Sequence, residues 1–116
     1  MANVFLCYAS EDRQLAESVQ LALAAGGHVV FFDRDSLHAG DDYHRRILTA
    51  IRACDAFVFL ATSHSTAKGK YTLSELRFIR QRWPNPVGRV LTVNPSNLPA
   101  SALPPYLRSD VSFRFQ

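Results

Sequence analysis

Hydrophobic residues are concentrated in five short runs that recur along the chain at intervals of about two dozen residues. The first four runs are nearly continuous and rich in Val, Phe and Leu, as expected of strands buried on both faces of a parallel sheet. The fifth alternates apolar and polar residues, which predicts an edge strand with one face in water. The predicted strands are residues 4–8, 28–32, 56–61, 89–93 and 111–115.

A helix is predicted between the first two runs. Ser10 is a candidate N-cap, because its hydroxyl can accept a hydrogen bond from a backbone N–H of the first turn. Glu11 and Asp12 follow it, where the helix dipole favours acidic side chains. The pair Gly26-Gly27 ends this helix. Its expected core face comprises Leu15, Val19, Ala22 and Leu23.

Two further helices are predicted from apolar residues at helical spacing. One follows Asp41 as a candidate cap, and the other begins near Thr72 and ends before Pro84. Four of the six prolines fall between residues 94 and 110, which leaves room there for only a short helical turn. The core face expected for the helix after Asp41 comprises Tyr43, Ile47, Ala50, Ile51 and Cys54.

This alternation of strands and helices predicts an α/β fold, a flavodoxin-like doubly wound five-stranded parallel sheet in a single domain. Ligands of such sheets bind beyond the carboxyl ends of the strands, where the strand order reverses. That crevice would gather Tyr8, Ala9 and Ser10 after the first strand and residues 62–65 after the third.

Composition and charge exclude several classes of function. The 13 basic residues outnumber the 10 acidic ones only slightly and are dispersed, so we expect no direct binding to nucleic acid. No secretory or membrane-spanning segment is present, which predicts a cytoplasmic protein without membrane contact. Cys7 and Cys54 lie in apolar segments without metal-ligand spacing, and we expect two ordinary buried thiols.

Familiar cofactor motifs are also missing. The chain has no dinucleotide fingerprint, phosphate loop or nucleophile elbow. Its four histidines have spacings that make no metal site. The sequence therefore predicts neither a resident cofactor nor a metal.

Three segments, taken in order, resemble the Toll/interleukin-receptor (TIR) domain in its bacterial form. Residues 5–12, FLCYASED, look like the opening box of the family. Residues 30–43 are similar to its second strand and BB loop, with the Asp-x-Asp-x-Leu-x-x-Gly pattern met at Asp33, Asp35, Leu37 and Gly40. Ser65, Tyr71 and Glu75-Leu76 match the bacterial pattern of Ser, spacer, aromatic, three residues and Glu-Leu. The resemblance covers nearly the whole chain.

The resemblance implies an NAD+ nucleosidase whose catalytic residue is Glu75. Cleavage of the nicotinamide ribosyl bond builds positive charge on the ribose, as glycoside hydrolysis does. Nicotinamide leaves a pyridinium as a neutral molecule, so no acid has to protonate it and a single carboxylate can be enough. Such a carboxylate could hold the ribose hydroxyls and face the developing cation, provided that water is excluded.

Each expected substrate-binding residue could also have a purely structural role. Tyr71, where many bacterial members carry Trp, could stack on a substrate ring or simply pack. Ser10 could bind a phosphate or cap its helix. Thr72-x-x-Glu75 also spells a capping box, a purely structural role for the acidic side chain. The full expected set is Tyr8, Ala9, Ser10, Asp33, Asp35, Leu37, Ser63 and Tyr71, of which Asp33 and Asp35 could instead organise their loop.

For the whole chain, the resemblance implies NAD+ as substrate, giving nicotinamide with ADP-ribose or a cyclic ADP-ribose product. It also implies self-association through the BB loop, in antiphage defence, with a fused or partner sensor module. The chain ends directly after its fifth run, so we expect residues 1–116 to be one TIR domain cut from a longer protein.

Two other classes of function stay open. One is a non-catalytic module that recruits other TIR domains. The weaker one is a receiver-like phosphorylation domain, for which Glu11 and Asp12 offer carboxylates, although no Lys follows Lys70. The BB-loop Pro of many receptor-type members is absent, with Ala39 standing before Gly40, which weakens any transfer of receptor-style signalling contacts.

Overall fold

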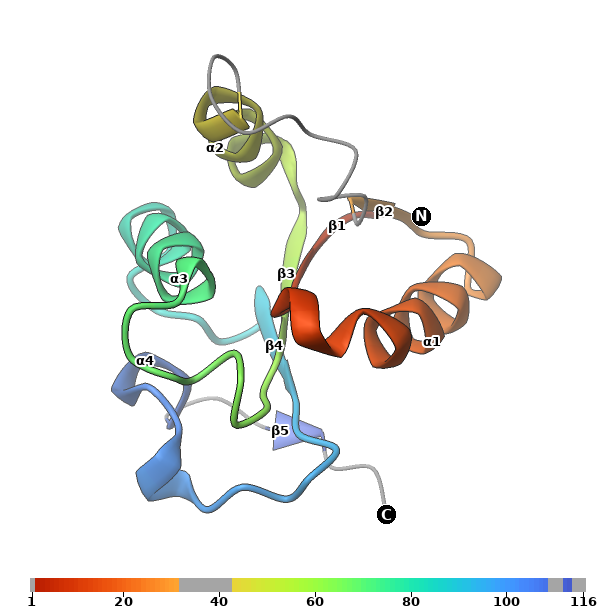
Figure 1. Cartoon of the computed structure of the whole chain (residues 1–116). Helices are drawn as coiled ribbons and strands as arrows, with labels where there is room; N and C mark the ends of the chain where they lie inside the picture. The colour runs from red at the N-terminus through yellow and green to blue at the C-terminus, as the bar shows by residue number, and fades with distance from the viewer. Residues whose placement is uncertain (1, 32–42, 109–111, 114–116) are drawn as a thin grey trace.

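A parallel sheet forms the centre of the molecule (Figure 1). The computed structural model describes residues 2–31, 43–108 and 112–113. The strand order is β2-β1-β3-β4-β5, the order of flavodoxin-like sheets, and every pair is parallel, which confirms the predicted fold class. The strands are β1 (Asn3–Cys7), β2 (Val29–Phe31), β3 (Ala56–Leu60), β4 (Val90–Val93) and β5 (Ser112–Phe113).

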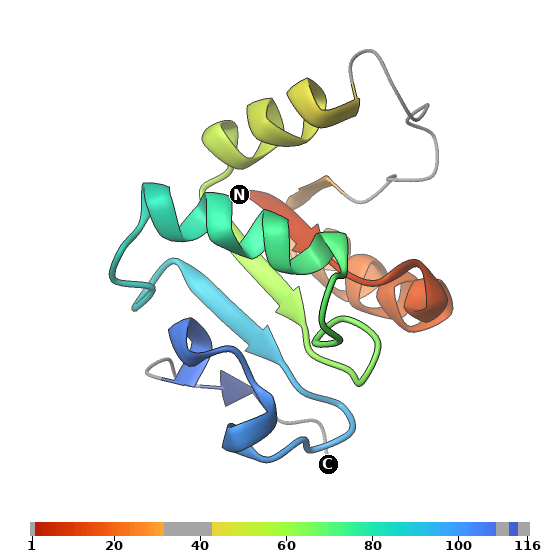
Figure 2. The ribbon, with the colours of Figure 1, turned by 60° about the vertical axis from the view of Figure 1, so that its left-hand side comes forward.

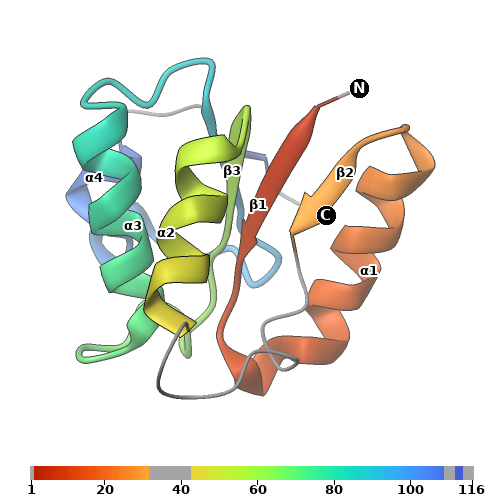
Figure 3. The ribbon, with the colours of Figure 1, turned by 90° about the horizontal axis from the view of Figure 1, so that it is seen from above.

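Helices cover both faces of the sheet (Figure 3). On one side lies α1 (Arg13–Ala25), and on the other lie α2 (Tyr43–Ala53), α3 (Tyr71–Arg82) and the short α4 (Pro105–Arg108). Successive side chains of a strand point to opposite faces, so β1 contributes Phe5 and Cys7 to the core under α2 and α3, and Val4 and Leu6 to the core under α1. Burial on both faces explains the continuous apolar runs of the central strands.

The two outer strands differ from the inner ones. β5 lies at one edge, as the alternating fifth run predicts. β2 lies at the other edge, and Val29 is 52% exposed, so the prediction that the first four strands are all buried is wrong for β2. An edge strand pairs with a neighbouring strand on one side only, so the backbone groups on its other side stay unpaired. Because β2 is only three residues long, few such groups are exposed.

The start of the first helix also differs from the prediction. Ser10 begins a 3-10 turn, η1 (Ser10–Asp12), and α1 begins at Arg13 without a side-chain cap, so Ser10 is not an N-cap. The buried face of α1 also differs from the expected one. Ala16 and Val19 are its buried residues, whereas Leu15 is 37% exposed.

The ends of the helices follow the sequence more closely. The first helix ends at the glycine pair, where Gly27 has φ +86° and the backbone N–H of His28 donates to the carbonyl of Leu23. On α2, Ile47 and Ile51 are buried, as predicted. Between β4 and β5 the proline-rich segment holds two short turns, η3 (Ala100–Ala102) and α4, where one was expected.

Candidate functional site

The carboxyl ends of the strands lie side by side at one end of the sheet, its carboxyl edge, near the start of α3 (Figure 2). Two loops are joined there by Asp12. Its carboxylate accepts a hydrogen bond of 2.5 Å from the Thr62 hydroxyl and lies 2.9 Å from Nδ1 of His64. The loop after β1 and the loop after β3 are therefore neighbours, as the fold predicts.

A second contact links the same two loops at the surface. The ammonium group of Lys70, just before α3, forms an ion pair with the carboxylate of Glu11. The hydrogen bond from Lys70 lowers the pKa of Glu11 below its ordinary value. The sequence pattern indicates Glu11 and Asp12 only as acids of a first turn or of a receiver site. It does not predict their contacts with the second loop, because these join residues fifty or more positions apart.

Buried hydroxyl groups fix the path of the chain from β3 into α3. The Ser65 hydroxyl donates to the carbonyl of Leu60 at 2.6 Å and accepts from the backbone N–H of Thr62 at 2.9 Å. The Thr72 hydroxyl donates to the carbonyl of Ser65 at 2.6 Å. Buried hydroxyls stabilise a structure only when they are paired in this way. The Ser of the third motif thus holds the loop that leads to Glu75.

The capping-box reading of Thr72 and Glu75 is wrong. The N-cap of α3 is Lys70, with extended backbone (φ −74°, ψ 145°) and no side-chain cap. Thr72 is therefore already inside the first turn, and its hydroxyl is bonded to Ser65. A capping box needs its Ser or Thr at the N-cap itself, so Glu75 does not fill the structural role that its spacing allowed.

Glu75 lies in the second turn of α3, with its side chain 0% exposed. Its Oε1 is 3.3 Å from the Sγ of Cys7, which is also 0% exposed and ends β1. The same Sγ lies 3.7 Å from the carbonyl oxygen of Thr72. Transfer of a carboxylate from water to a protein interior costs several kcal/mol, so glutamates are rarely so deeply buried without a specific task.

The structure separates the other expected site residues into groups. Tyr71 is half-buried and packs against the cluster that contains Cys7. Tyr8 is fully buried, but in the core under α1, on the opposite face of the sheet. Ala9 is buried, and Ser10 and Ser63 are exposed. Asp33, Asp35 and Leu37 lie outside the described residues.

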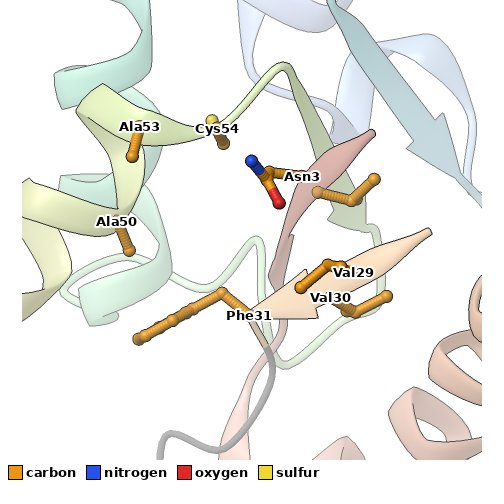
Figure 4. A pocket seen from close by; sticks show the side chains of 8 residues that line it. Asn3, Val29, Val30, Phe31, Ala50, Ala53 and Cys54 are labelled. Atoms are coloured by element: carbon orange, nitrogen blue, oxygen red, sulfur yellow. The ribbon is translucent and has the colours of Figure 1, made fainter. Parts of the chain in front are cut away.

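Two surface depressions occur elsewhere. One, of about 260 Å³, lies between the edge strand β2, its neighbour β1 and the last turn of α2, and its lining is almost entirely apolar (Figure 4). The other, of about 160 Å³, lies between α3 and α4 and includes Arg77 and Arg80. Glu75 lines neither of them.

The described residues hold no group of three His, Cys, Asp or Glu side chains that could bind a metal ion. Within the described residues, no helix is long and apolar enough to cross a membrane. Cys7 and Cys54 are both buried free thiols, as predicted. The sequence pattern predicted Cys7 to be an ordinary core residue and did not predict its contact with Glu75. Its place at the end of a strand, next to the predicted crevice, was the signal.

Comparison with known proteins agrees with this architecture. The family model described as "TIR domain" matches residues 4–116. Among solved structures, a metazoan TIR-STING receptor from C. gigas, in complex with 2′,3′-cGAMP, superposes with a TM-score of 0.75 at 16% sequence identity. The match covers 96% of this chain and 34% of the receptor chain, so this chain spans about a third of that protein. No curated protein gives a significant match. The chain belongs to the TIR domain family, as its three sequence motifs and its sheet order together indicate.

Proposed function

We propose that this TIR domain cleaves NAD+ at the nicotinamide ribosyl bond and that Glu75 is its catalytic residue. The observation that carries the proposal is the fully buried carboxylate at the carboxyl edge of the sheet, held beside Cys7. A structural role as a capping box does not account for it, because Lys70 is the N-cap. Strongly desolvated acids at such an edge are typical of functional sites.

The chemistry requires only one acidic group. As the bond to nicotinamide breaks, positive charge develops on the ribose, and a carboxylate in a dry site stabilises that charge more strongly than one in water. The same carboxylate can accept hydrogen bonds from ribose hydroxyls and so hold the sugar in place. Water or another part of the substrate then captures the ribosyl cation, which gives ADP-ribose or a cyclic product.

Burial of Glu75 also bears on regulation. A carboxylate that is 0% exposed cannot touch a substrate until neighbouring groups move. Tyr71, one turn earlier on α3 and half-buried, is a candidate to move. We propose that self-association shifts the population toward an open form, so that the isolated domain has low activity. This fits a defence protein whose NAD+ consumption must wait for an infection signal from a sensor module.

The second candidate is a non-catalytic module that binds other TIR domains. The observation that favours it is the same burial, because a pure interaction module needs no accessible carboxylate. In that case Glu75 would serve packing alone.

Product analysis separates the two candidates. The purified domain is incubated with NAD+ over a range of protein concentrations, and nicotinamide, ADP-ribose and cyclic products are separated by chromatography. We expect nicotinamide release whose rate per molecule rises with protein concentration, and loss of release in Glu75→Ala at equal fold content. Equal signals from wild type and Glu75→Ala would favour the interaction module, and a rate per molecule independent of dilution would exclude activation by assembly.

A further inference from the structure

The second buried polar group beside Glu75 is the thiol of Cys7. Backbone pairing fixes its position, because Cys7 is in register with Phe59 of β3 in the middle of the sheet. Its side chain is 0% exposed and points into the core under α3, where Oε1 of Glu75 is 3.3 Å away. The thiol is therefore held by the sheet, while the carboxylate is carried by a helix that packs on it.

The contact has a definite polarity. A thiol has one S–H donor, and an ionised carboxylate can only accept. The Thr72 carbonyl is another acceptor near this sulfur, but at 3.7 Å it is further away than Oε1 of Glu75. The S–H therefore points to the carboxylate, and a hydrogen bond to a charged acceptor is stronger than one to a neutral group.

We propose that Cys7 is a positioning residue for Glu75, whose S–H holds the carboxylate in the orientation that NAD+ cleavage needs. This inference rests on the proposed function. A glutamate side chain has several rotatable bonds, and small misplacements of a catalytic group cost large factors in rate. A donor anchored in the central strand β1 restricts those rotations from the side opposite to α3.

Cys54 provides a matched control within the same chain. It is also a buried free thiol, and its Sγ donates to a carbonyl, that of Ile51, at 3.1 Å. Burial raises the pKa of Cys54, so this thiol stays protonated as a donor near neutral pH. It follows α2, and the hydrogen bonds of its Sγ are to Ile51 and Arg82 rather than to Glu75. Changes at Cys54 therefore report the cost of altering a buried thiol as such.

The test compares Cys7→Ser with Cys7→Ala, together with Cys54→Ser and Cys54→Ala. Serine and alanine leave nearly the same space, but only serine keeps a donor. We expect Cys7→Ala to lower kcat for nicotinamide release by about tenfold, the effect of one lost hydrogen bond to a charged group. KM should change little, because the substrate contacts remain. Cys7→Ser should recover most of the lost rate, and both Cys54 variants should match wild type.

All variants are compared below their melting temperatures and at equal fold content. Each outcome then shows whether the Cys7 S–H positions Glu75. Equal losses in Cys7→Ser and Cys7→Ala would overturn the proposal, because packing alone would then explain them. Wild-type kcat in Cys7→Ala would overturn it as well. A wild-type protein that releases no nicotinamide at any concentration would contradict the proposed function itself, which is a different result from either of these.

Discussion

Replacement of Glu75 by Gln should raise stability while it removes activity. The side chains have the same shape, and Oε1 remains an acceptor for the Cys7 thiol. In its ionised form Glu75 is a buried charge, whose desolvation costs several kcal/mol, and the change removes that charge. Against this, an amide donor placed in the core without a good partner costs about 1–3 kcal/mol. The balance is a gain of about 1–2 kcal/mol in the free energy of unfolding.

For a domain of this size, 1 kcal/mol corresponds to about 4 °C in Tm, so Glu75→Gln should melt about 4–8 °C higher. Thermal unfolding followed by circular dichroism measures this directly. Glu17→Gln is the control, because Glu17 is an exposed carboxylate in an i,i+4 pair with Arg13 on α1, and such pairs contribute about 0.5 kcal/mol or less. A Tm for Glu75→Gln several degrees below wild type would contradict this prediction, because the carboxylate would then be a net stabilising part of the core.

Two further predictions concern the contacts around the start of α3. Thr72→Val should lower the free energy of unfolding by about 1–3 kcal/mol, because it leaves the buried carbonyl of Ser65 without its donor. Chemical denaturation measures this loss, and an unchanged midpoint would contradict the prediction. Lys70→Met should return the pKa of Glu11 toward its ordinary value, as followed by NMR titration of the carboxyl carbon. Because the pKa of Glu11 is lowered in the folded protein, the Glu11–Lys70 pair contributes its small stabilisation at pH values above the ordinary pKa of Glu. This contribution is lost as the pH falls through the lowered pKa of Glu11. A Glu11 titration that is the same in both proteins would show that the ion pair is not formed in solution.

Strand positions were predictable because strands buried on both faces have nearly continuous runs of apolar residues. The runs around Phe5 and Phe57 contain few polar residues, and these are central strands. The edge position of β2 was not predictable, since an apolar residue such as Val29 reads the same at an edge as in the centre. Order in the sheet is set by packing between distant segments.

The candidate site was predictable in outline and not in detail. The motif that contains Glu75 identified the right helix, and the fold predicted that this helix starts at the carboxyl edge of the sheet. Whether the side chain meets solvent or core depends on how α3 is rotated against β1, which local spacing does not encode. The same limit applies to caps, because Ser10 and Thr72 qualify by residue type but do not occupy the N-cap position. The roles of Asp33, Asp35 and Leu37 stay predictions.

The catalytic role of Glu75 can be tested by a structure of the Glu75→Gln protein with NAD+ bound, in whatever assembled form binds it. We expect the side-chain oxygen at position 75 to lie about 3 Å from a hydroxyl of the nicotinamide ribose, with the nucleotide at the carboxyl edge of the sheet. NAD+ bound elsewhere, for example in the apolar depression between β2 and α2, with the side chain at position 75 still enclosed in the core, would show that Glu75 is not the catalytic residue.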